Sequence, residues 1–225
     1  MAMLKQLRRV LVGLATLSCA TFASASVVYT FDSTAVAAFG AGPYGTVTLT
    51  EVGSDVTINV SLRSDMDFVN TGGPHSVFSF NVLGAATTDI SSIKFNGVAA
   101  SSLFSVVTSG DNQPFGTEFS LAIDCTSANC QNGAPGASSD PLTFTVLNAK
   151  YTDFGFLAPG TTAMFASDVI CVSGACNGST GAIGVTHTPD GGVPPTSFPV
   201  PEPGSLTLVG AALMALAATR RRKAQ

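Results

Sequence analysis

The stretch Asp55-Val56-Thr57-Ile58-Asn59-Val60-Ser61-Leu62 decides the fold class. Apolar and polar side chains alternate along it, which is the two-residue period of a β-strand with one buried face. We therefore expect four residues to be buried on one face of a sheet: Val56, Ile58, Val60 and Leu62. The three residues between them should point to the opposite face: Thr57, Asn59 and Ser61.

The same pattern continues on both sides of this stretch. A similar run contains Val47 and Leu49, and Gly53-Ser54-Asp55 predicts a hairpin turn between the two runs. Other short strands are predicted at residues 27–31, 77–82, 119–124, 142–147 and 164–172, with less regular ones at 90–95, 103–107 and 182–185. In the run 119–124, Phe119, Leu121 and Ile123 should point inward. Residues 26–187 are thus predicted to form an all-β domain, an antiparallel sandwich or jelly roll.

Residues 1–25 have the three parts of a secretory signal peptide. These parts are the cations Lys5, Arg8 and Arg9, an apolar run at residues 10–20, and the small-residue site Ala23-Ser24-Ala25. Cleavage after Ala25 would make Ser26 the first residue of the mature chain. A lipoprotein signal would use Cys19 instead, but Thr16 stands where such signals favour Leu.

The C-terminal residues 200–225 have the composition of a membrane anchor. Residues 204–219 carry no charge and are rich in Leu and Ala, and as a transmembrane helix they would be roughly 24 Å long. The hydrocarbon core is thicker, about 30 Å, but a basic end can snorkel to the headgroups. That end is Arg220-Arg221-Arg222-Lys223, and such clusters stay cytoplasmic. The body of the protein should therefore lie outside the inner membrane.

A proline-flanked glutamate directly precedes the predicted helix. In Pro201-Glu202-Pro203 the two prolines hold the backbone extended. This triplet, the short helix and the Arg-rich end together resemble the PEP-CTERM sorting signal of Gram-negative bacteria. The resemblance implies that an exosortase, a membrane-embedded enzyme with a cysteine protease-like site, processes the chain near the triplet. It also implies a destination at the cell surface or in an exopolysaccharide matrix. The alternative is a passive membrane anchor.

The segment between the two signals is acidic. Between Ser26 and Val200 the sequence has three basic and thirteen acidic residues, a net charge of −10, whereas the whole precursor carries −4. An acidic body with few cations argues against nucleic acid as a partner. Residues 188–199 are rich in Pro and Gly, and we expect an extended, exposed linker there.

The mature chain has four cysteines in two C-x4-C pairs, and an even number in an exported protein indicates disulfides. They are Cys125, Cys130, Cys171 and Cys176. Three connectivities are open, of which the local one pairs Cys125 with Cys130 and Cys171 with Cys176. A zinc site built from these cysteines is the alternative.

Other polar residues suggest further hypotheses. Asp65, Asp67 and Asn70 alternate in a way that could bind calcium, but the Gly and the closing Glu of an EF-hand are missing. The alternative is a solvated acidic loop. The two histidines, His75 and His187, have no G-x-S-x-G elbow to accompany them, and we predict no catalytic site.

These observations predict a non-enzymatic protein of the cell surface or exopolysaccharide matrix that needs no cofactor. Its expected partners are the exosortase, the inner membrane during export, and exopolysaccharide. Two other classes of function remain open. One is a secreted glycan- or calcium-binding module, and the other is a secreted hydrolase. The segment from Asp67 to His75 also resembles segments of some PEP-CTERM proteins, but this resemblance assigns no role to any residue.

Overall fold

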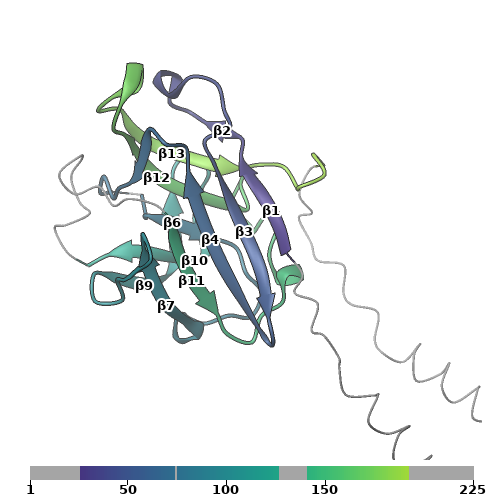
Figure 1. Ribbon diagram of the computed structural model, residues 1–225. Coiled ribbons are helices and arrows are strands. Elements are labelled where there is room, and N and C mark those ends of the chain that lie inside the picture. The colour runs from purple at the N-terminus through teal and green to yellow at the C-terminus, as the bar shows by residue number, and fades with distance from the viewer. Residues whose placement is uncertain (1–25, 74, 127–140, 193–225) are drawn as a thin grey trace, which may run out of the picture.

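The computed structural model describes residues 26–73, 75–126 and 141–192, which form two antiparallel β-sheets packed face to face (Figure 1). Sheet A contains, in spatial order, β1 (Ser26–Phe31), β3 (Gly45–Val52), β4 (Asp55–Leu62), β11 (Leu142–Val146), β7 (Ile90–Phe95) and β8 (Val98–Ala99). Sheet B contains β2 (Ser33–Thr34), β13 (Thr180–Val185), β12 (Phe165–Cys171), β6 (Phe78–Phe80), β10 (Gly116–Cys125) and β9 (Phe104–Asn112), and β5 (Met66–Phe68) also pairs with β12. The prediction of an all-β, antiparallel, sandwich-like domain is confirmed.

Short 3-10 turns join some of the strands: η1 (Ala37–Phe39), η2 (Thr87–Asp89), η5 (Tyr151–Asp153) and η6 (Gly174–Cys176). Over the described ranges, no helix is both long and apolar enough to cross a membrane. The predicted signal peptide with Ala23 and Ala25, the triplet Pro201-Glu202-Pro203, the helix at 204–219 and the basic end at 220–223 lie outside the described residues.

The hairpin β3–β4 confirms the alternation that predicted the fold. In β4 the side chains of Val56, Ile58 and Val60 are fully buried, and the residues between them are only partly buried. Val52 pairs with Asp55, so Gly53 and Ser54 form a two-residue turn. Gly53 has a φ of +68°, a conformation that favours glycine over residues with a side chain.

Aromatic side chains fill the space between the sheets. Phe78 of β6 stacks on Phe80 and Phe165 within sheet B and meets Phe144 of sheet A edge-on, at a centroid distance of 5.9 Å. All four rings are fully buried. Aromatic pairs of this kind add to the hydrophobic stabilisation of a core. Phe78 therefore lies where the two sheets are held together.

Two expectations about individual segments were wrong. The stretch around Asp67, considered as a solvated loop, contains β5, whose Met66 and Phe68 are buried. Phe119 does not join Leu121 and Ile123 in the main core. It belongs to a second cluster of buried residues: Phe115, Phe119, Ala163, Ala166 and Ala182. The register of β10 shifts between Gly116 and Phe119, so regular pairing with β9 begins only at Phe119.

The beginning of the predicted linker also differs from the expectation. Residues 188–192 form a closed turn, because Thr188 N–H donates to the Gly192 carbonyl (2.9 Å) and Gly191 N–H donates to the Thr188 carbonyl (2.8 Å). The turn is nevertheless exposed at Pro189, Asp190 and Gly191. The rest of the linker lies outside the described residues.

A polar contact ties the end of β13 to the corner between β1 and β2, which we call the Asp32 clasp. Asp32 Oδ1 accepts hydrogen bonds from Thr186 N–H (3.0 Å) and Thr186 Oγ1 (2.8 Å). The other carboxylate oxygen lies 2.7 Å from His187 Nδ1. The clasp thus joins the last strand of sheet B to the point where the chain passes from sheet A to sheet B.

Candidate functional site

Two of the four cysteines predicted to form disulfides are bonded to each other in the structure. Cys171 at the end of β12 and Cys176 in η6 form a disulfide. This bond belongs to the local connectivity and to neither of the other two. Cys125 is disulfide-bonded as well. Cys130 lies outside the described residues.

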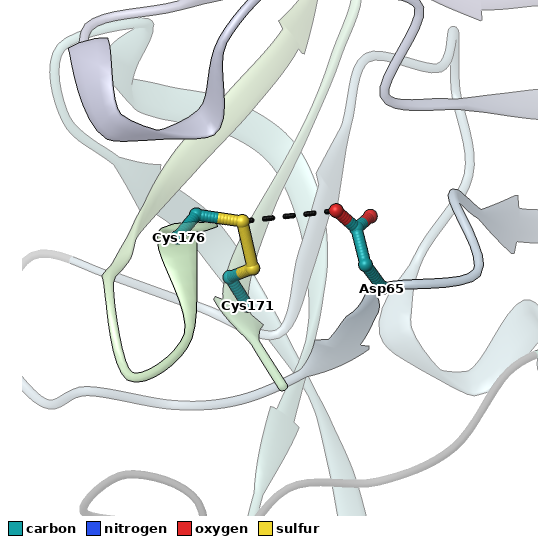
Figure 2. Close-up of side chains that lie close together, drawn as sticks. All are labelled: Asp65, Cys171 and Cys176. Carbon is teal, nitrogen blue, oxygen red and sulfur yellow. Dashed lines mark hydrogen bonds between the residues drawn. A yellow bond between two sulfur atoms is a disulfide. The ribbon is translucent and has the colours of Figure 1, made fainter. Parts of the chain in front are cut away.

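An acidic side chain lies beside this disulfide (Figure 2). The ligand atoms of Asp65, Cys171 and Cys176 are all within 4.8 Å of one another, and Asp65 Oδ2 is 3.7 Å from Cys176 Sγ. Because a disulfide sulfur carries no proton and no thiolate charge, this approach is a van der Waals contact and not a metal-binding pair. The oxidised arrangement therefore disfavours zinc at this position.

Arg63 forms an ion pair with the carboxylate of Asp65. Its Nε lies 2.6 Å from Oδ1 and its Nη2 lies 3.1 Å from Oδ2, which is a bidentate pair. The guanidinium also donates to the carbonyls of Phe39 and Ala41 and lies over the Tyr44 ring, 5.4 Å from its centroid. Asp65 could bind calcium only by giving up this pair. Its companion in the calcium hypothesis, Asp67, lies half-buried in β5.

A more unusual polar site lies where sheet B is interrupted. Phe68 of β5 is paired with Val169, and Phe78 of β6 is paired with Ser167. Both strands thus run along the same side of β12, with only Asp168 between their pairing partners. The chain between them, residues 69–77, leaves the sheet at Asp168 and returns to it. Pro74 in this segment lies outside the described residues.

Asp168 is fully buried beneath this segment. Its Oδ2 accepts hydrogen bonds from the backbone N–H and from Oγ1 of Thr71, both at 2.7 Å, whereas Oδ1 has no hydrogen-bond partner. Burial raises the pKa of the Asp168 carboxyl above its ordinary value. The bonds from Thr71 and the nearby His75 oppose this rise and do not cancel it.

Three neighbouring side chains also have a buried atom without a hydrogen-bond partner: His75 Nδ1, Asp111 Oδ1 and Asn112 Oδ1. With Asp168 we call them the polar cluster. His75 and Asn112 form an isolated β-bridge, and Asn112 Nδ2 donates to the Ser76 carbonyl (2.9 Å) and to Ser79 Oγ (2.8 Å). Burial raises the pKa of Asp111 too, and His75 again opposes the rise.

The polar cluster holds residues 69–77 against the sheet. Asn70, considered as a calcium ligand, instead donates from Nδ2 to Asp124 Oδ1 on β10. Carboxyl groups with raised pKa values gather at functional sites, but structural polar networks produce the same shifts. Among the residues that the structure describes, the one group of three Asp, Glu, His or Cys ligands within 4.8 Å is that of Asp65. The polar cluster is therefore not a preformed metal site. Its hydrogen bonds instead hold residues 69–77 against sheet B.

The two histidines lie in different environments. His75 is partly buried in the polar cluster, and His187 is exposed and held by the Asp32 clasp. Sequence reasoning missed Asp168, Asp111 and Asn112. For Asp168 a signal was available, because it is the one acidic residue in β12, where all seven side chains are buried. An acid in such a strand must have polar partners.

Replacing Asp168 by Asn should change how stability depends on pH. The pKa of Asp168 is higher in the folded chain than in the unfolded chain, so the folded state binds more protons between the two values. Stability from this group is therefore greatest below the unfolded pKa, about 3.9, and falls as the pH rises through the folded pKa. Asp168→Asn removes the titrating group while its amide oxygen can still accept from Thr71.

As the pH rises from 3.5 to 7.5, we therefore expect the free energy of unfolding of Asp168→Asn to increase relative to that of the wild type. The increase should be no more than about 1.4 kcal/mol per pH unit. Urea unfolding at each pH measures the difference. Asp190→Asn is the matched control, because hydrogen bonding to Thr188 lowers the pKa of Asp190; its trend has the opposite sign, is confined to pH values below about 4, and leaves the difference nearly flat at higher pH. A flat or falling difference for Asp168→Asn would contradict the prediction.

Comparison with known proteins finds a match at the C-terminal end of the chain, beyond the sandwich domain. The described part defines a disulfide-bonded, all-β domain of acidic sequence. Residues 199–223 match the PEP-CTERM protein-sorting motif. This motif is an exosortase recognition signal, and it implies an extracellular or cell-surface protein exported by a Gram-negative bacterium and processed by an exosortase. No curated protein and no solved structure matches the chain.

Proposed function

We propose that this chain is a non-enzymatic structural or interaction protein of the cell surface or the extracellular matrix. The observation that carries the proposal is the PEP-CTERM motif at residues 199–223. In this proposal, residues 204–219 hold the exported precursor in the inner membrane and the basic residues 220–223 stop translocation. The exosortase then cuts near Pro201-Glu202-Pro203 and releases the β-sandwich.

The described body supports a structural role. Its core joins the two sheets through the edge-on contact of Phe78 with Phe144, and disulfides are typical of exported domains. The polar cluster and the Asp32 clasp bind segments of the chain to each other. His75 Nδ1 has no hydrogen-bond partner, and His187 Nδ1 is taken by Asp32 and Thr186. In the described part of the chain, neither histidine hydrogen-bonds to a serine or cysteine side chain, the usual nucleophiles of a nucleophile–base pair.

Intact-mass measurement of the protein recovered from the cell surface tests this function. We expect a chain that starts at Ser26 and ends near Pro201-Glu202-Pro203, without residues 206–225. The membrane fraction of the same cells should contain the longer precursor. A surface form that still ends at Gln225 would refute processing, and protein found only inside the cell would refute export.

A further inference from the structure

The outward face of sheet A is an ordered array of hydroxyl and amide side chains. Strands β1, β3, β4, β11 and β7 lie side by side in this sheet (Figure 1). Their outward residues form what we call the hydroxyl face: Ser26, Thr30, Thr46, Thr48, Thr50, Thr57, Asn59, Ser61, Ser91, Thr143 and Thr145. Val28 and Lys94 are the other two residues in its rows.

The strand register sets these side chains in straight rows across the sheet. One row runs Val28, Thr48, Asn59, Thr143 and Lys94. The next runs Ser26, Thr50, Thr57, Thr145 and Ser91. A shorter third row contains Thr30, Thr46 and Ser61. Neighbouring strands are about 4.8 Å apart, so each row, apart from Val28, offers one polar group per strand at a nearly constant interval.

The face is accessible and partly pre-ordered. Each of its side chains is partly or fully exposed. Asn59 Nδ2 donates to Thr143 Oγ1 at 3.0 Å, Ser61 Oγ donates to Asn59 Oδ1 at 3.3 Å, and the Ser26 and Thr50 hydroxyls are 3.5 Å apart. Side chains that already hydrogen-bond to each other lose less conformational freedom when a ligand arrives. Threonine also loses little, because its β-branch restricts the side chain.

The charge of the face selects the class of ligand. Lys94 and, next to Thr57 on the outward side of β4, Asp55 are the charged residues of this side of the sheet, whereas the mature body carries a net charge of −10. An anionic polymer would be repelled by the body, and a cationic one would find a single carboxylate, Asp55, whose Oδ1 already accepts hydrogen bonds from Ser54 Oγ and Asn148 N–H. Hydroxyls both donate and accept hydrogen bonds, as the hydroxyls of a sugar do. The interval of about 4.8 Å along each row is also comparable to the length of one sugar residue in an extended chain.

We propose that the hydroxyl face binds a neutral polysaccharide chain that lies across the strands of sheet A. This inference rests on the proposed function, because it names the matrix component to which the released protein attaches. Contact is made by many hydrogen bonds to successive sugars, without the aromatic stacking that a Trp-free face cannot provide. Each contact is weak, and the repeating polymer makes the sum useful.

Cosedimentation of the surface-released protein with insoluble neutral polysaccharide tests the inference. The probes are amorphous cellulose and insoluble starch, with a calcium alginate gel as the anionic comparison. The variant Thr48→Val/Thr57→Val/Thr143→Val removes three hydroxyls and keeps side-chain shape and β-branching. We expect it to bind about tenfold or more weakly, since each neutral hydrogen bond is worth roughly a factor of five. Circular dichroism should show the same fold as the wild type.

The matched control is Thr108→Val/Thr117→Val, which makes the same change at exposed positions of β9 and β10 in sheet B. It should bind as the wild type does. Three results would overturn the inference: a wild type that binds neither neutral polysaccharide, a triple variant that binds as well as the wild type, or equal binding to alginate. A dimer that the triple variant abolishes in sedimentation velocity would also overturn it, by assigning the face to a second copy. Correct release from the membrane together with failed binding would refute only this inference, whereas failed release would refute the proposed function.

Discussion

The precursor in which Pro201, Glu202 and Pro203 are all replaced by alanine should accumulate in the inner membrane. The predicted helix at 204–219 and the basic end at 220–223 are unchanged, so the anchor survives while the exosortase loses its recognition motif. Alanine also removes the rigid, extended backbone that the two prolines impose. We expect release to the surface to fall by at least about tenfold, as for loss of a specific enzyme contact worth more than 1.4 kcal/mol. Immunoblotting of membrane and surface fractions measures the ratio.

Pro194→Ala/Pro195→Ala/Thr196→Ala is the matched control for this variant. It makes the same number of changes, including two at prolines, a few residues upstream in the linker. We expect it to be released normally. Deleting the exosortase should reproduce the accumulation seen with the altered triplet. Normal release of intact protein in either case would leave residues 200–225 as a passive anchor only.

The largest loss of stability in the body should come from Phe78→Ala. Phe78 is fully buried, and its ring contacts Phe80, Phe165 and, across the sandwich, Phe144. Truncation removes apolar burial and leaves a cavity that neighbouring strands cannot close, which typically costs about 3–5 kcal/mol. Equilibrium unfolding in urea with disulfides intact would measure this loss in the free energy of unfolding.

Val98→Ala provides the comparison at an apolar residue that is not buried. Val98 lies in the edge strand β8 with 70% of its surface exposed. The change should alter the free energy of unfolding by less than about 0.5 kcal/mol. If Phe78→Ala were no more destabilising than Val98→Ala, the aromatic contact between the sheets would not be a principal source of stability.

The fold could be predicted where one sheet face is buried and the other is not. In β4 and β11 the alternation is regular, and both strands lie where expected. It fails where both faces are covered. β5 is three residues long, and its polar neighbours concealed the buried Met66 and Phe68. Phe119 was misassigned because a two-residue period does not reveal the second cluster of buried residues that receives it.

The candidate site was less predictable, because its residues come from distant parts of the chain. His75 and Asn70 were noticed as local features, yet their environments depend on Asp168, Asp111 and Asp124 in three other strands. No pattern within a single segment of the sequence predicts these contacts between segments. The hydroxyl face shows the same limit, since the alternation predicted outward Thr57, Asn59 and Ser61 in β4 but could not predict how the strands align into rows.

The Asp32 clasp has a mechanical consequence for a domain held by its C-terminal end. Tension applied beyond residue 192 enters the sandwich at Thr186 and His187, directly after β13. Without the clasp, β13 could be peeled from β2 and β12 one hydrogen bond at a time. Because Asp32 contacts both Thr186 and His187, the force also acts on the corner between β1 and β2. This corner belongs to the connection between the two sheets. A pull on the chain after His187 must therefore break the contacts of Asp32 before it can separate β13 from β2 and β12.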